Sequence, residues 1–253
     1  MDTSNFAEKG YDIVAAGNLD KLAELRTQIH RKARELAGDG EDDPETFMNN
    51  FHRLELRGPE LNRLRMELIK YVSDNLDVAQ TIYEAFSGYL TELVGPDIVV
   101  QKTTNLVIQQ PGDPDQVPTH RDAPLNSPFE VVVWIPLVSV YGTKSMYVLD
   151  REKTDVSLQM LKKPESGYED QTRFATEQGD ILSMPFGHAL FFWPGLVHAV
   201  GVNAEQETRW ALNIRYKNLF APSGAKGQAE FFEVLRLSPL ARLALEYEKG
   251  AYA

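Results

Sequence analysis

The chain has 253 residues, 43% of them hydrophobic, so it can bury a sizeable core and is expected to be globular rather than disordered. Its formal net charge of −11 is not offset by any Lys/Arg-rich block, which argues against binding to a nucleic-acid backbone. The absence of cysteine excludes disulfides, thiolate metal sites, iron–sulfur clusters and a cysteine nucleophile.

The sequence carries no evident targeting or membrane signal. The N-terminus, MDTSNFAEKGYDIVAAG, lacks a basic start followed by an apolar run, so it does not resemble a secretory signal. No apolar stretch approaches the length that spans a bilayer. The expectation is a soluble cytoplasmic protein that has neither a nucleic acid nor a membrane as its partner.

Residues 1–95 are expected to be mostly helical. In LDKLAELRTQIHRKARELAG the apolar residues recur at helical spacing, and Gly38 and Gly40 follow as stop signals. An acidic loop, GDGEDDPE, comes next. Helical patterns then resume at about residues 44–56, 59–75 and 78–93, and two of these begin with a proline at a plausible first-turn position.

Residues 96–220 are rich in short strand-like segments, among them DIVVQ, TNLVIQQ, FEVVVWIPLVSV, ALFFW and RWALNIRYKNLF. Several strands in succession without intervening helices indicate an antiparallel sandwich or jelly roll. Residues 221–253 return to a helical pattern. We therefore expect one domain over residues 1–253, mainly β with flanking α, in which a jelly-roll core is packed by N- and C-terminal helices.

The stretch PTHRDAPL contains a candidate metal-binding pair, His120 and Asp122. Residues two apart in an extended chain point to the same face, so both side chains could reach one ion. His198, in FFWPGLVHAVGVN, is the best candidate for a third ligand. Two imidazoles and a carboxylate form the facial triad of non-haem Fe(II) oxygenases. The alternative reading of His-X-Asp alone is a polar strand end.

The segment HAVGVNAEQETRWALNIRYKNLF suggests a hairpin centred near Asn203, which would place Arg209 opposite His198. A buried arginine needs an anionic partner, and a cosubstrate carboxylate would satisfy it. The alternatives for Arg209 are solvent or an ion pair with a glutamate of the turn. Arg215 lies on the same strand face, but about 20 Å further along the strand, and is therefore expected to lie away from His198.

These motifs resemble a known family. THRD, GHALFFWPGLVHAVGVN and TRWALNIRYKNLF are similar to segments of the Fe(II)/2-oxoglutarate-dependent oxygenases of the phytanoyl-CoA hydroxylase-like superfamily. TRWALNIRYKNLF and NLVIQQPGDPDQVPTHRDAPL look closest to the StrG-like hydroxylases and related oxygenases of bacterial carbohydrate gene clusters. The resemblance covers about Asn105 to Pro222. A departure is YGTKSMYVLD, which stands where many members carry a PGSH-type stretch.

The resemblance implies a double-stranded β-helix core and residue roles. His120, Asp122 and His198 match the iron ligands, and Arg209 matches the residue that anchors the distal carboxylate of 2-oxoglutarate. Dioxygen would be the oxidant. Halogenating members replace the carboxylate ligand with a small residue, so Asp122 favours hydroxylation or a related oxidation. The implied substrate is a polar small molecule such as a sugar or aminoglycoside-type intermediate.

Several further residues are candidates for supporting roles. Gln109 is a plausible polar contact, and Trp134 a core residue that could wall the cosubstrate pocket. His188 is expected at a turn or pocket rim, and the amphipathic C-terminal stretch either covers the sandwich or forms a homodimer contact. Two other function classes fit the same ligands: a non-catalytic jelly-roll carbohydrate- or metal-binding protein, and a cupin-like metal isomerase or zinc hydrolase.

Overall fold

The computed structural model describes residues 2–38, 40–113, 117–123, 125–163 and 167–247. The helices are α1 Ser4–Lys9, α2 Leu19–Ala37, α3 Pro44–Asn50, α4 Pro59–Asn75, α5 Val78–Val94, α6 Arg151–Met160, α7 Tyr168–Gln178, α8 Gln228–Phe231 and α9 Pro239–Glu246, with short 3-10 turns at Phe51–Leu54 and Gly142–Lys144. The strands are β1 Tyr11–Ala15, β2 Ile98–Gln101, β3 Asn105–Gln109, β4 Val117–His120, β5 Glu130–Pro136, β6 Tyr147–Val148, β7 Asp180–Ile181, β8 His188–Phe192, β9 His198–Val200, β10 Arg209–Asn218 and β11 Phe232–Arg236. Within the described ranges, no helix is long and apolar enough to cross a bilayer.

The N-terminal helices form where the sequence predicts them. The side chain of Asn18 accepts a hydrogen bond from the backbone N–H of Lys21 at the start of α2. Gly38 ends α2 in the left-handed conformation (φ 81°), and its N–H bonds the carbonyl of Arg34. The predicted bounds 59–75 match α4, and 78–93 differs from α5 by one residue. These helices present their apolar faces to the sheet.

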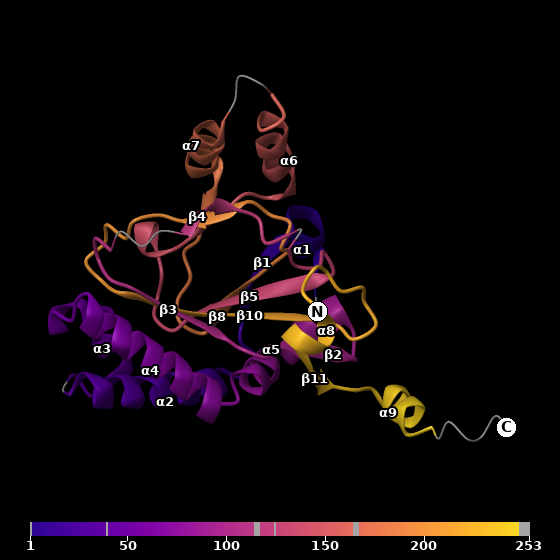
Figure 1. The fold of residues 1–253 in the computed structure, drawn as a ribbon, viewed down its shortest axis with the longest axis horizontal. Helices are drawn as coiled ribbons and strands as arrows, with labels where there is room; N and C mark the ends of the chain where they lie inside the picture. The colour runs from indigo at the N-terminus through magenta and orange to yellow at the C-terminus, as the bar shows by residue number, and fades with distance from the viewer. Residues whose placement is uncertain (1, 39, 114–116, 124, 164–166, 248–253) are drawn as a thin grey trace.

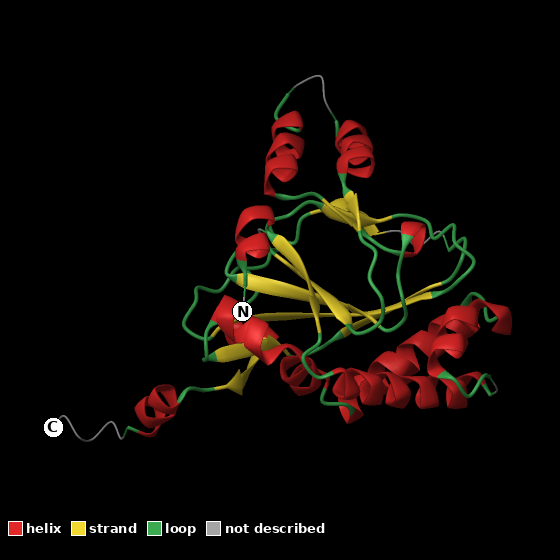
Figure 2. Ribbon diagram, turned by 180° about the vertical axis from the view of Figure 1, so that it is seen from behind, coloured by secondary structure: helices red, strands yellow, loops and turns green. Residues whose placement is uncertain are grey.

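The strands form two antiparallel sheets. The larger has the order β1-β8-β5-β10-β2-β11, with β3 also paired to β10, and the smaller has the order β4-β9-β6-β7. Figures 1 and 2 place α2, α3 and α4 on one side of the large sheet and the small sheet, with α6 and α7, on the other. The fold is therefore a mixture of helices and antiparallel sheets arranged in layers.

Strand β10 lies centrally and separates two cores. Trp210, Leu212 and Ile214 pack with the N-terminal helices. Ala211 faces the opposite way, into a second apolar cluster that also contains Trp134 of β5 and Val148 of β6 and so joins the two sheets. The odd-numbered side chains of β10 therefore point into the space between the sheets.

Two expectations about secondary structure were wrong. Helices α6 and α7 interrupt the strand region; α6 is capped by Asp150, and its buried residues are the small polar Thr154 and Ser157, which give no apolar signal. In the C-terminal part, Phe232–Arg236 is a strand that pairs with β2 rather than part of a helix. Pairing with the edge of an existing sheet overrides the local helical pattern there.

Candidate metal centre

The structure brings His120, Asp122 and His198 together between the sheets. Strands β4 and β9 pair with His120 opposite His198, and the two imidazole rings lie 4.3 Å apart between centroids. Asp122 follows β4, and its Oδ1 lies 3.7 Å from Nε2 of His120. One ligand atom from each residue lies within 4.8 Å of the others, and no other such cluster occurs among the described residues.

Backbone carbonyls fix the orientation of both imidazoles. Nδ1 of His120 lies 2.7 Å from the carbonyl oxygen of Pro118, and Nδ1 of His198 lies 3.0 Å from that of Leu196. A carbonyl oxygen can only accept, so each Nδ1 carries the hydrogen and each Nε2 keeps its lone pair. This is the outer-shell arrangement that prepares histidine for metal ligation.

Arg215 holds the second oxygen of Asp122. Its guanidinium donates to Oδ2 of Asp122 at 2.8 Å and to Oε1 of Gln101 at 3.1 Å. Burial raises the pKa of Asp122, but Arg215 and the two histidines outweigh it, so the net pKa lies below the usual value. Asp122 is therefore ionised at neutral pH, and its Oδ1 faces the histidines.

His198 is held in its neutral form. The side chain is buried, and this burial lowers its pKa to about 4, despite the opposing effect of Asp122. Its ring packs edge-on against Phe192 with centroids 4.9 Å apart. A neutral imidazole is the ligating form, so the site suits a divalent cation at neutral pH.

Arg209 is buried without a carboxylate partner among the described residues. Its side chain is 2% exposed, it donates to the carbonyl oxygen of Ser145 at 3.2 Å, and its Nε has no partner. Burial lowers its pKa to about 10, so it stays charged at neutral pH. Because Arg209 shares a strand face with Arg215, which bonds Asp122, it faces the same space as the cluster.

Gln109 and Trp134 lie near these groups. Gln109 is the cross-strand partner of Arg209, and its Nε2 donates to the carbonyl oxygen of Gly201 at 3.0 Å. Gln109 and Arg209 both extend from the large sheet, and each donates to a backbone carbonyl oxygen on the side of the small sheet. Trp134 lies in the apolar cluster between the sheets, opposite Asn213 of β10. The roles of these residues in cosubstrate binding stay predictions.

The structure corrects two inferences about β10. His198 and Arg209 are not cross-strand partners, because β9 belongs to the small sheet and β10 to the large one. Arg215 does not lie away from the cluster but contacts it through Asp122. Alternation along β10 correctly placed Arg209 and Arg215 on one face of the strand. The error was the assumption that His198 lies in the same sheet, next to Arg209.

Four further polar residues lie outside the metal cluster and make contacts within the fold: His188, Thr119, Thr143 and Lys144. His188 begins β8 opposite Ala15 and lies outside the metal cluster. Thr119 shares a hydrogen bond with the hydroxyl of Tyr147. Thr143 donates to Glu205 at 3.0 Å, and the fully buried Lys144 pairs with Glu207 at 2.7 Å.

Comparison with known proteins yields similarity of fold only. No family model and no curated protein matches the sequence. The solved structure of the non-heme monooxygenase ThoJ with nickel matches with a TM-score of 0.55 at 16% identity, over 94% of this chain and 85% of that one. The non-heme alpha-ketoglutarate-dependent carbocyclase SnoK from nogalamycin biosynthesis matches with a TM-score of 0.54 at 15% identity, over 89% and 86%. AviO1 from Streptomyces viridochromogenes Tue57 matches at 0.51 and 17%, over 87% and 94%. The chain shares its fold with these proteins.

Proposed function

We propose that this protein is an Fe(II)- and 2-oxoglutarate-dependent oxygenase that hydroxylates a polar small molecule. In this proposal it is a member of the phytanoyl-CoA hydroxylase-like superfamily, nearest the StrG-like branch, and its two sheets form a double-stranded β-helix. His120, Asp122 and His198 would hold the iron. The substrate class, a sugar or aminoglycoside-type intermediate, follows from the sequence resemblance described above.

The observation that carries the proposal is the burial of Arg209 on the face of β10 that also carries Arg215, the residue that contacts the metal-binding cluster through Asp122. A buried guanidinium without a counter-charge is costly, and a bound dicarboxylate would supply that charge. Neither a zinc hydrolase nor a non-catalytic metal-binding module needs such a group. The fold shared with an alpha-ketoglutarate-dependent carbocyclase agrees with this reading.

The described residues fit the proposed iron and cosubstrate. The Nε2 atoms of His120 and His198 and the Oδ1 of Asp122 present three donors of the type that suits Fe(II). Arg209 Nε and Ser145 Oγ are buried polar atoms without hydrogen-bond partners. Trp134 offers an apolar wall. When bound, iron would activate dioxygen as the oxidant for attack on a C–H bond, and 2-oxoglutarate would supply two of the four electrons by its conversion to succinate and carbon dioxide.

The chain's own residues then have separate tasks. The carbonyls of Pro118 and Leu196 hold the two imidazoles in one tautomer, which keeps the ligating nitrogens available. Arg215 fixes the Asp122 carboxylate and leaves one oxygen for the metal. Arg209 orients the cosubstrate by its far carboxylate. The carboxylate at position 122 favours hydroxylation, whereas ring closure, the reaction named for the carbocyclase SnoK, is a different outcome that product analysis would reveal.

Replacement of Arg209 by glutamine tests the assignment of the cosubstrate. Removal of one partner from a buried charge pair weakens binding strongly, so the Kd for 2-oxoglutarate should rise by about 100-fold. The measurement is an anaerobic titration of the Fe(II)-loaded protein, followed by the visible charge-transfer band. Uncoupled formation of succinate in air provides a second readout.

The control is Arg31→Gln, which alters an exposed arginine on α2 and should leave the titration unchanged. Metal affinity should be the same in Arg209→Gln and in the unmodified protein, because Arg209 does not contact the ligands. If the unmodified protein develops neither the band nor succinate, the oxygenase assignment is wrong. Activity with zinc in place of iron would favour the hydrolase alternative.

A further inference from the structure

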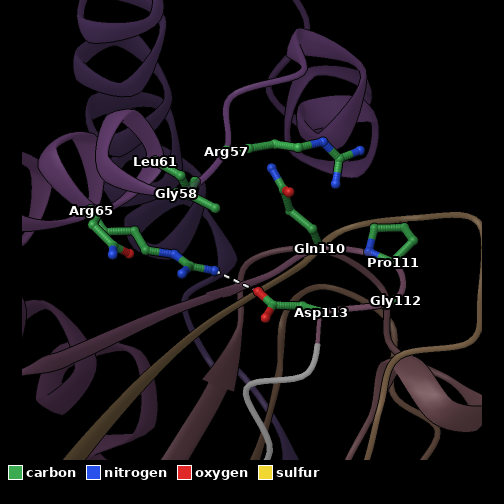
Figure 3. Close-up of a pocket in the computed structure, with 9 residues that line it drawn as sticks. Arg57, Gly58, Leu61, Arg65, Gln110, Pro111, Gly112 and Asp113 are labelled. Atoms are coloured by element: carbon green, nitrogen blue, oxygen red, sulfur yellow. Dashed lines mark hydrogen bonds and ion pairs between the residues drawn. The ribbon is translucent and has the colours of Figure 1, made fainter.

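A second polar pocket lies outside the metal centre, between α4 and the turn that follows β3. It has a volume of about 260 Å³ and is shown in Figure 3. It is lined by Arg57, Gly58, Leu61, Asn62, Arg65, Gln110, Pro111, Gly112 and Asp113. Its size lies just below the range of drug-sized ligand sites, so it suits a small ligand.

Two hydrogen-bond donors converge in this pocket without an acceptor between them. Gln110 is 6% exposed, and its Nε2 has no hydrogen-bond partner. Figure 3 shows this amide nitrogen directed toward Arg57, whose side chain extends across the pocket. A buried amide donor left unpaired costs free energy, so the geometry favours a ligand that brings an acceptor.

The beginning of α4 adds further donors. The N-cap of this 17-residue helix is Gly58, which has no side chain to cap it, and Pro59 is the first helical residue. The next backbone N–H groups, of Glu60 and Leu61, have no acceptor within the helix. Gly58 and Leu61 line the pocket, so the positive end of the helix dipole lies at its wall.

The charges of the pocket leave an excess of one positive charge. Arg65 donates to Oδ2 of Asp113 at 2.8 Å and to the carbonyl oxygen of Ile108 at 2.6 Å, so this cation is already paired with an anion. Arg57 is exposed and brings the additional charge. An anionic group would therefore meet a cation, an amide donor and a helix N-terminus.

We propose that this pocket binds a small oxyanion, the carboxylate or phosphate group of a small metabolite. Gln110 Nε2 and Arg57 would donate to it, and Leu61 and Pro111 would contact its carbon skeleton or ester oxygen. The pocket lies at the N-terminal end of α4, on the helix-covered face of the large sheet, whereas the metal cluster lies between the sheets. It is thus a separate site and does not depend on the proposed oxygenase activity.

The test uses the full-length protein in its metal-free form, and the signals of Gln110 distinguish binding in this pocket from binding of malonate at Arg209. Sodium phosphate and sodium malonate are titrated separately at low ionic strength. Binding is followed by calorimetry and by the side-chain amide signals of Gln110 in a ¹⁵N-correlated NMR spectrum. We expect at least one probe to bind and to shift those signals, with an affinity that falls as sodium chloride is added.

Three variants test whether the anion binds in this pocket or elsewhere on the protein. Gln110→Leu and Arg57→Gln should each weaken the binding probe by about tenfold or more, because each removes a donor to a charged group. Arg63→Gln alters an exposed arginine on the same helix, outside the pocket, and should have no effect. The relative affinities for phosphate and malonate identify which group the site prefers. If neither probe binds, or if all variants bind equally, the site assignment is wrong.

Discussion

Replacement of His198 by alanine is expected to abolish tight binding of a divalent metal. His198 is the buried member of the cluster, and it supplies one of three donor atoms that lie within 4.8 Å of one another. Loss of an outer-shell partner typically costs about 10–100-fold in metal affinity, so loss of a direct ligand should cost more than about 100-fold. The measurement is competition against a chromogenic chelator, with Fe(II) handled anaerobically and Mn(II) or Zn(II) as air-stable probes.

Two further variants separate loss of a ligand from loss of fold. His198 packs against Phe192, so alanine leaves a cavity, and His198→Gln retains more of the side-chain volume. His188→Ala removes a histidine that lies outside the cluster and should bind metal as the unmodified protein does. A folded His198→Gln protein that binds metal with unchanged affinity would contradict the assignment of His198 as a ligand.

The proximity of the three candidate ligands could be predicted from the sequence. The spacing of His120 and Asp122 indicated a shared direction, although Asp122 lies just beyond the end of β4 rather than within it. The apolar strand pattern around His198 indicated an interior position, and the ring is indeed buried. The spacing alone was sufficient to bring His120 and Asp122 together, because residues two apart in the sequence lie close to each other in whichever sheet the strand joins.

The position of Arg209 was inferred by an argument that the structure does not support. Residues 201–208 do not form a tight hairpin but carry the chain from the small sheet to the large one. Asn203 stabilises this crossing by donating to the carbonyl oxygens of Gln109 and Glu207. The partners of β10 are β3, β5 and β2, which lie far away in the sequence. Local turn rules cannot give such non-local register. Arg209 is buried because alternation along β10 directs it between the sheets.

Replacement of Arg215 by methionine is expected to weaken both metal binding and the fold. Arg215 is the cation that contacts Oδ2 of Asp122 at 2.8 Å, and it lies 3.8 Å from Oε2 of the buried Glu130. Its removal leaves two carboxylates without this counter-charge, which should lower the free energy of unfolding of the metal-free protein by about 3–5 kcal/mol. Metal affinity should fall by about 10–100-fold, because Asp122 loses the group that orients it.

Lys217 provides the control that distinguishes positioning of Asp122 from stabilisation of the fold. It lies two residues further on the same face of β10 and is fully buried, but it donates to the carbonyl oxygen of Ala221 at 2.9 Å and to Ser223 rather than to Asp122. Lys217→Met should therefore reduce stability in urea unfolding without changing metal affinity.

Arg215→Lys keeps the charge and should recover part of the affinity. A bound divalent cation stabilises the folded state in proportion to its affinity, so the stability lost in Arg215→Met should be larger with saturating metal than without it, by about 1.4–2.7 kcal/mol for a 10–100-fold loss of affinity. An equal loss in both forms, with unchanged metal affinity, would show that Arg215 supports the fold and does not position the ligand.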